Sequence, residues 1–265
     1  MVARIRVAGS RGCDAVGGER DGEHPVEASF GSGDGGAAAG DVGAAAADLL
    51  AFGAACLAAG HAGVGTSDDA SFGTIIADPP WRFSNRTGKM APEHHRLSRY
   101  GTMTLQEIKS LPVARLSKAD SHLYLWVPNA LLPEGLAVME SWGFTYKTNL
   151  IWYKVRKDGG PDGRGVGFYF RNVTEVLLFG VRGSLRTREA GRRQTNIIVK
   201  RKREHSRKPD EQYDLVERCS PGPYLELFAR HARPGWAQWG DEMSAGAPES
   251  PRASSIESDG TSTPT

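Results

Sequence analysis

The fold of this chain can be worked out from the segment Gly73-Thr74-Ile75-Ile76-Ala77-Asp78-Pro79-Pro80-Trp81. Its β-branched run predicts a buried strand, and the two prolines end that strand abruptly because proline has a fixed φ and no N–H. In an open α/β sheet, ligands bind at the carboxyl ends of the strands. The sequence therefore predicts a site where the carboxylate of Asp78, an unpaired carbonyl of Pro79 and the ring of Trp81 lie side by side.

This combination suits attack by a weakly nucleophilic exocyclic amine, such as N6 of adenine. Asp78 and the Pro79 carbonyl could each accept one N–H and direct the nitrogen lone pair towards an electrophile, while Trp81 stacks on the base. The candidate catalytic residues are Asp78, Pro79, Pro80 and Trp81. The alternative is a simple turn followed by a core tryptophan, and the short motif alone does not decide between the two.

The 265 residues suit one domain with tails. Ala and Gly make up about half of the first 65 residues, so residues 1–66 are expected to be a largely disordered extension in which residues 44–59 could form one helix. Strands and helices alternate across residues 67–243, which predicts an α/β domain with a mostly parallel sheet and helices on both faces. Residues 244–265 are rich in Ser, Thr and Pro and are expected to be a disordered tail.

The cysteines and histidines predict the compartment and the metal content. Cys13, Cys56 and Cys219 are widely spaced and form no paired motif, which is typical of the reducing cytoplasm. We recognise no secretory signal, and the Ala-rich segment has too few large apolar residues to span a membrane. His94 and His95 are adjacent and cannot share a helix face, so no metal site is expected.

The formal net charge of +2 hides a basic middle of the chain. Residues 82–208 hold 25 Lys and Arg against 10 Asp and Glu, and residues 182–208 alone hold 11 against 2. Such a stripe indicates a polyanion partner, although a solvated loop would have the same composition. The candidate substrate-binding cations are Arg192, Arg193, Lys200 and Arg201.

Three local patterns bear on the arrangement. Thr104 and Glu107 form a capping box that predicts the start of a short helix. His122 lies in a predicted strand, residues 121–127, and is expected to be a structural side chain rather than a base. Residues 156–167 are Gly-rich like a dinucleotide loop, but extended chain follows where that fingerprint requires a helix, so we expect a mobile loop beside the site.

Several separated blocks between Phe72 and about Met243 combine into one larger pattern. They are Asp78-Pro79-Pro80-Trp81, Tyr100-Gly101-Thr102-Met103-Thr104, Leu123-Tyr124-Leu125-Trp126-Val127, Arg171-Asn172-Val173-Thr174-Glu175 with Gly180-Val181-Arg182-Gly183, His205-Ser206-Arg207-Lys208-Pro209-Asp210-Glu211, and Leu225-Glu226-Leu227-Phe228-Ala229-Arg230. In this order they resemble the MT-A70 family of S-adenosylmethionine-dependent adenine-N6 methyltransferases.

The resemblance implies a Rossmann-like methyltransferase fold with S-adenosylmethionine as the cofactor. It implies that Asp78 contacts both the target amine and the methionine end of the cofactor, and that Tyr100 borders the adenine pocket. It also implies that Lys208 neutralises the cofactor carboxylate. The residues expected on the ribose and adenosine side are Arg230, Asp241 and Glu242. Some family members have Asn-Gln where this chain has Asp241-Glu242, which leaves the separate roles of these two open.

The expected function is therefore methyl transfer to N6 of adenine in nucleic acid. The Ala/Gly/Arg-rich composition suggests a bacterial or phage-like source and favours DNA over RNA. Two alternatives stay open: a non-catalytic family member that only binds nucleic acid, and an amino-methyltransferase that acts on cytosine N4. A homodimer or heterodimer is also left open.

Overall fold

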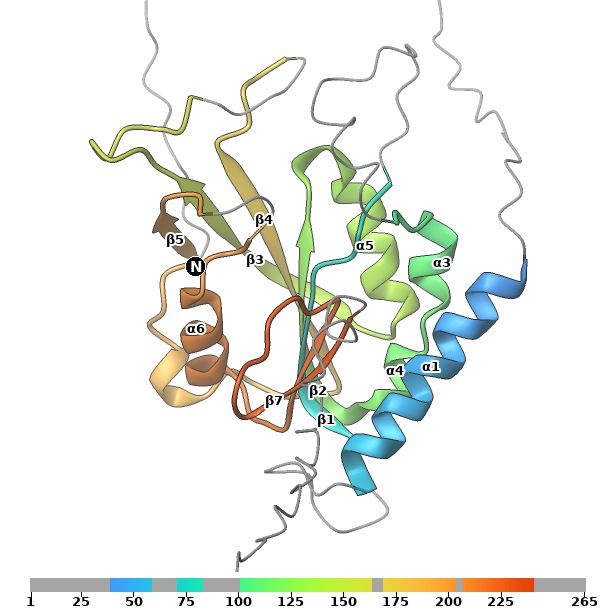
Figure 1. Cartoon of the computed structure of the whole chain (residues 1–265). Helices are drawn as coiled ribbons and strands as arrows, with labels where there is room; N and C mark the ends of the chain where they lie inside the picture. Colours follow the sequence, from blue (N-terminus) through green and yellow to red (C-terminus); the bar gives the residue numbers. More distant parts are fainter. Residues whose placement is uncertain (1–38, 59–70, 83–100, 164–168, 204–206, 241–265) are drawn as a thin grey trace, which may run out of the picture. The chain divides into compact units, whose positions relative to one another are not determined.

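The structure, a computed structural model, describes residues 39–58, 71–82, 101–163, 169–203 and 207–240, with the side chains of the first helix described from residue 43 to 56. The expected tail, residues 244–265, lies outside this part. The helices are α1 (Ala39–Ala58), α3 (Leu105–Ser110), α4 (Val113–Leu116), η1 (Asn129–Leu131), α5 (Leu132–Ser141), η2 (Glu189–Gly191) and α6 (Glu211–Cys219). The strands are β1 (Phe72–Ala77), β2 (Ser117–Val127), β3 (Thr145–Lys154), β4 (Thr174–Arg182), β5 (Ile197–Lys200), β6 (Tyr224–Leu227) and β7 (Trp236–Trp239) (Figure 1).

The described strands form one seven-stranded sheet in the order β5-β3-β4-β2-β1-β6-β7. Strand β1 is parallel to β2 and to β6, and the pairs β6–β7 and β3–β5 are also parallel. Strand β4 runs antiparallel to both of its neighbours, so it opposes the direction of the other described strands. The predicted mostly parallel α/β sheet is confirmed, with the reversed strand as a feature that the sequence did not indicate.

Alternate residues of the central strands feed two separate hydrophobic clusters. Ile75 of β1 and Leu125 of β2 belong to the cluster that also contains buried residues of α1, α3, α4 and α5. Ile76 of β1 and Trp126 of β2 belong to the other cluster, which contains Leu215 and other buried residues of α6. Because side chains alternate across a strand, helices cover both faces of the sheet, as predicted (Figure 1).

Helix α1 lies within the part of the chain assigned from sequence to the N-terminal extension, and it includes most of the predicted helix at residues 44–59. Leu49 is fully buried and joins the same cluster as Ile75 of β1. The indole N–H of Trp239 in β7 donates to the Asp48 carboxylate at 2.8 Å. This helix therefore packs on the sheet domain, while the boundary at residue 66 stays a prediction.

Two of the local sequence predictions are confirmed. The Thr104 hydroxyl accepts the backbone N–H of Glu107 at 3.2 Å, and the Glu107 carboxylate accepts the N–H of Thr104 at 2.5 Å, which completes the capping box. His122 is fully buried, with Nδ1 2.8 Å from the hydroxyl of Ser220 and Nε2 3.2 Å from the carbonyl of Leu185. Among the described helices, none is long and apolar enough to cross a membrane.

Candidate active site

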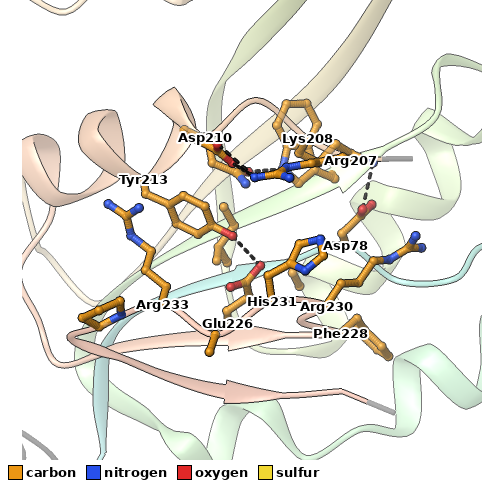
Figure 2. A pocket seen from close by; sticks show the side chains of 16 residues that line it. Asp78, Arg207, Lys208, Asp210, Tyr213, Glu226, Phe228, Arg230, His231 and Arg233 are labelled. Carbon is orange, nitrogen blue, oxygen red and sulfur yellow. Dashed lines mark hydrogen bonds and ion pairs between the residues drawn. The ribbon is translucent and has the colours of Figure 1, made fainter. Parts of the chain in front are cut away.

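The site lies where parallel strands β1, β2 and β6 end at the same edge of the sheet. Asp78 directly follows β1, and its backbone N–H points to the carbonyl of Leu227, the last residue of β6, at 3.5 Å. A cavity of about 240 Å³ opens here. Its lining includes Asp78, Trp126, Lys208, Tyr213, Glu226 and Arg230. The structure thus brings together three residues predicted from sequence, Asp78, Lys208 and Arg230 (Figure 2).

Lys208 holds the carboxylate of Asp78 at this cavity. Its Nζ donates to Asp78 Oδ2 at 2.8 Å and lies 3.3 Å from Glu175 Oε2 and 5.4 Å from the centre of the Trp126 ring. Burial raises the pKa of Asp78, and the cation of Lys208 offsets this only in part. Burial also acts to lower the pKa of Lys208, but the carboxylates of Asp78 and Glu175 outweigh it and hold that pKa above its usual value. Lys208 therefore remains charged at neutral pH.

A second carboxylate, Glu226 of β6, lines the cavity together with Asp78 (Figure 2). Its Oε1 accepts the phenol O–H of Tyr213 at 2.8 Å, and its Oε2 accepts the amide of Gln238 at 2.7 Å. Burial raises the pKa of Glu226, with the two hydrogen bonds acting against it. Such an oriented carboxylate can accept hydrogen bonds from neighbouring hydroxyl groups of a ligand.

The chain after β6 turns sharply around the cavity. Phe228 has a φ of 64°, in the left-handed region that non-glycine residues rarely adopt, and both Phe228 and Arg230 line the cavity. The backbone of Ala229 is held between them, because its N–H donates to the carbonyl of Trp239 at 2.9 Å. Strained conformations of this kind persist where surrounding contacts fix them, often at ligand sites.

The prolines after Asp78 differ from the prediction in one respect. The carbonyl of Pro79 is not unpaired, because it accepts the N–H of Trp81 at 2.8 Å in a tight turn. A carbonyl oxygen has two lone pairs, so Pro79 keeps one acceptor position. The carbonyl of Pro80 accepts the N–H of Met103 at 2.9 Å, which holds the segment after Tyr100 beside this turn.

Trp81 points into the protein. The residue is 7% exposed and belongs to the same hydrophobic cluster as Ile75, and its indole N–H donates to the carbonyl of Trp126 at 2.9 Å. In this position it offers little ring surface to a base and has the contacts of the core tryptophan that was the alternative. A stacking role for Trp81 stays a prediction.

The four candidate substrate-binding cations are all exposed, but they do not lie together. Lys200 ends β5, so Lys200 and Arg201 lie at the carboxyl edge of the sheet, where Asp78 lies. Arg192 and Arg193 come before β5, next to η2. The carbonyl of neighbouring Gly191 lies 3.9 Å from the Sγ atom of Cys219, the last residue of α6. The first turn of α6, at the other end of that helix, lines the cavity. The predicted basic stretch is therefore split between two ends of the sheet.

Three predicted site residues, Tyr100, Asp241 and Glu242, lie outside the described residues. Conversely, sequence reasoning missed Glu226 and Tyr213 of the cavity, and it missed the ion pairs of Glu175. Glu175 and Glu226 stand inside the quoted sequence blocks, which was the available signal. Within the described ranges, no group of three or more His, Cys, Asp or Glu side chains is placed to hold a metal ion.

The amino-acid sequence of the chain is similar to those of several known proteins. An N(6)-adenosine-methyltransferase MT-A70-like protein of Arabidopsis thaliana is 34% identical over 178 residues, which cover 65% of this chain and 24% of the relative. The N(6)-adenosine-methyltransferase catalytic subunit METTL3 of Homo sapiens is 31% identical over 176 residues, 65% of this chain and 28% of the relative. Type II methyltransferase M.MunI of Mycoplasma sp is 28% identical over 188 residues, 64% of this chain and 76% of the relative.

The chain thus spans about a quarter of the length of the plant and human relatives. The sequence model of the MT-A70 family matches residues 72–242, which run from β1 past the end of β7 and include the whole described cavity. The resemblance carried by the separated sequence blocks is confirmed by this match, and the chain belongs to the MT-A70 family.

Proposed function

We propose that this protein transfers a methyl group from S-adenosylmethionine to the N6 amine of adenine in a nucleic acid, with DNA favoured over RNA. The observation that carries the proposal is the carboxylate of Asp78 at the strand end, held by Lys208 in a cavity. The relatives named N(6)-adenosine-methyltransferases support adenine as the target base. The composition of the chain favours DNA, and the cysteine pattern favours the cytoplasm.

Asp78 acts through hydrogen bonding and position. An ionised Asp78 accepts one N–H of the exocyclic amine, and the free lone pair of the Pro79 carbonyl accepts the other. Two acceptors placed in this way draw the nitrogen towards a tetrahedral geometry and aim its lone pair away from them, which is catalysis by orientation and electrostatics. The acceptor amine loses a proton during the transfer, and the Asp78 carboxylate with its raised pKa is suited to receive it.

The described residues fit the expected cofactor. S-adenosylmethionine supplies the activated methyl group when it is bound. Its carboxylate would be held by Lys208, whose charge faces the cavity, and its ribose hydroxyls would donate to Glu226, which Tyr213 and Gln238 already orient. Arg230 lines the same cavity and is proposed to contact the adenosine side. Asp241 and Glu242 keep their predicted adenosine-side roles as part of this proposal.

The nucleic acid would lie along the carboxyl edge of the sheet. Lys200 and Arg201 are exposed there and suit contacts with phosphates, which contribute affinity rather than sequence choice. A base inside a duplex cannot present its amine to a cavity, so the target adenine must leave its stack or come from a single strand. Tyr100 is proposed to border this adenine.

The test is methylation of matched DNA and RNA strands, followed by nucleoside mass spectrometry. We expect N6-methyladenine from the wild type, and at least a roughly hundredfold lower rate from Asp78→Ala, because removing a transition-state interaction of this kind costs that much. Glu140→Ala, an exposed carboxylate on α5, is the matched control and should keep the wild-type rate. Circular dichroism should show that both variants fold.

Three outcomes would contradict the proposal. N4-methylcytosine as the product would assign the protein to cytosine. Nucleic-acid binding without methylation or cofactor binding would identify a non-catalytic family member. An Asp78→Ala rate above about a tenth of the wild-type rate would remove Asp78 from catalysis.

A further inference from the structure

Beside the cavity, four charged side chains form an unbroken line of alternating sign. Lys208 contacts Asp78 on one side and Glu175 on the other, at 2.8 and 3.3 Å. The second oxygen of the Glu175 carboxylate, Oε1, accepts a hydrogen bond from Lys154 Nζ. Glu175 is therefore shared between two lysines, and only one of the two lysines, Lys208, lines the cavity.

Lys154 is buried at the end of β3, and its placement is tightly specified. Its residue is 6% exposed, and its Nζ lies 4.8 Å from the centre of the Trp152 ring. Its backbone is held on both sides, because its N–H donates to the carbonyl of Val173 and its carbonyl accepts the N–H of Asp162, each at 2.8 Å. A buried ammonium is costly unless it is paired. In the described part of the chain, the Lys154 ammonium forms an ion pair with the carboxylate of Glu175.

The net charge of these four side chains indicates how Lys154 would affect Lys208. With all four groups ionised, the two lysines balance the two carboxylates. Without Lys154, the other three groups of this line, Lys208 and the carboxylates of Asp78 and Glu175, would together carry one net negative charge. Glu175 would then draw Lys208 more strongly, and an incoming carboxylate would meet an excess of negative charge. Lys208 would be less available to a ligand in the cavity.

We propose that Lys154 is a positioning residue, which neutralises Glu175 and so leaves Lys208 free to bind the carboxylate of the cofactor. This inference rests on the proposed function. Lys154 acts through Glu175 and Lys208 and touches neither cofactor nor substrate.

The experiment measures ligand binding by isothermal titration calorimetry with two probes. S-adenosylmethionine carries the carboxylate, whereas adenosine lacks it. We expect Lys154→Met to raise the Kd of S-adenosylmethionine about tenfold, a modest share of what breaking a buried ion pair costs, and to leave the Kd of adenosine within about twofold. Lys147→Met is the matched control, because Lys147 is exposed on the same strand. It should change neither constant.

A double-mutant cycle separates this role from a merely structural one. Glu175→Gln removes the charge that Lys154 balances, so adding Lys154→Met to it should change the Kd of S-adenosylmethionine by less than about threefold. Lys154→Arg keeps the charge and should keep the affinity. If Lys154→Met does not fold, the same comparison is made with Lys154→Gln alone and with Lys154→Gln combined with Glu175→Gln.

Three results would overturn the inference: an unchanged Kd of S-adenosylmethionine in Lys154→Met, an equal loss of adenosine affinity, or no suppression by Glu175→Gln. Each of these can occur while the wild type binds S-adenosylmethionine and methylates adenine, so the proposed function would stand. A wild type that does not bind S-adenosylmethionine would instead refute the proposed function, and this inference with it.

Discussion

The split of the basic stretch leads to a quantitative prediction about nucleic-acid binding. We compare two double variants that remove equal charge, Lys200→Gln with Arg201→Gln, and Arg192→Gln with Arg193→Gln. The first pair lies at the carboxyl edge of the sheet, as Asp78 does, whereas the second precedes β5 near the far end of α6. The first pair should therefore contribute most of the binding to phosphates.

The magnitude follows from the number of phosphates that the variant no longer binds. Lys200 pairs with Glu211 at 2.7 Å, but both side chains are about one-third exposed or more, so this pair contributes little and a phosphate can displace it. Removing two such cations should reduce the slope of log K against log salt by about 1.4 for single strands and about 1.8 for duplex. Between about 50 and 200 mM salt, wild-type affinity should then fall about 7- to 12-fold more than that of the variant.

The assay is fluorescence anisotropy with a labelled oligonucleotide at several salt concentrations. The variant that lacks Arg192 and Arg193 should change the slope by less than about 0.7, which is the change expected for the loss of one phosphate contact. The Kd of S-adenosylmethionine should be unchanged in both variants. An unaltered slope in the Lys200 and Arg201 variant would refute the reasoning and indicate that these residues face solvent or a partner subunit. Equal changes in both variants would show that all four cations act together, as the basic composition of this stretch predicted.

Two further predictions concern single residues. Lys208→Ala should raise the Kd of S-adenosylmethionine by about tenfold or more and lower the rate at saturating cofactor by a smaller factor, because Lys208 binds the cofactor carboxylate and takes no part in the methyl transfer itself. An unchanged Kd in calorimetry would contradict this. Burial lowers the pKa of His122, so the unfolded chain takes up a proton on that residue before the folded protein does. The associated stability is present above the unfolded value of about 6.5 and is lost as the pH falls below it, with a slope of at most about 1.4 kcal/mol per pH unit. Urea unfolding on either side of that value, at about pH 7.5 and about pH 5.5, measures this slope, and a His122→Gln variant with the wild-type slope would show that another group causes it.

Local sequence was sufficient for several of the elements and for the position of Asp78 at a strand end. The β-branched run before Asp78, the capping box at Thr104 and the prolines that end strands act over a few residues, so each could be recognised without knowing the fold. The prediction that Asp78 and Lys208 belong to one site also came from sequence, although 130 residues separate these two residues, which line the same cavity. In that case the resemblance of separated blocks supplied the information that spacing could not.

The tertiary structure decided which contacts the charged and aromatic residues of the site make. The reversed direction of β4 sets Glu175 beside Lys154 and Lys208, and no local pattern indicates a strand's direction. The hydrogen bond that holds the Trp81 ring in the core is likewise made to the carbonyl of Trp126 in β2, a partner that no local pattern reveals.

The same physical reason separates the two halves of the basic stretch. Composition shows that the cations are close in sequence, but Arg192 and Arg193 come before β5 and near the end of α6, whereas Lys200 and Arg201 lie at the carboxyl end of β5. Charge density is a property of the chain, whereas the distance from each charge to Asp78 is a property of the packed sheet. Residue order was therefore enough to predict a basic, amine-directed site at a strand end, and the packing of the sheet decided which side chains reach it.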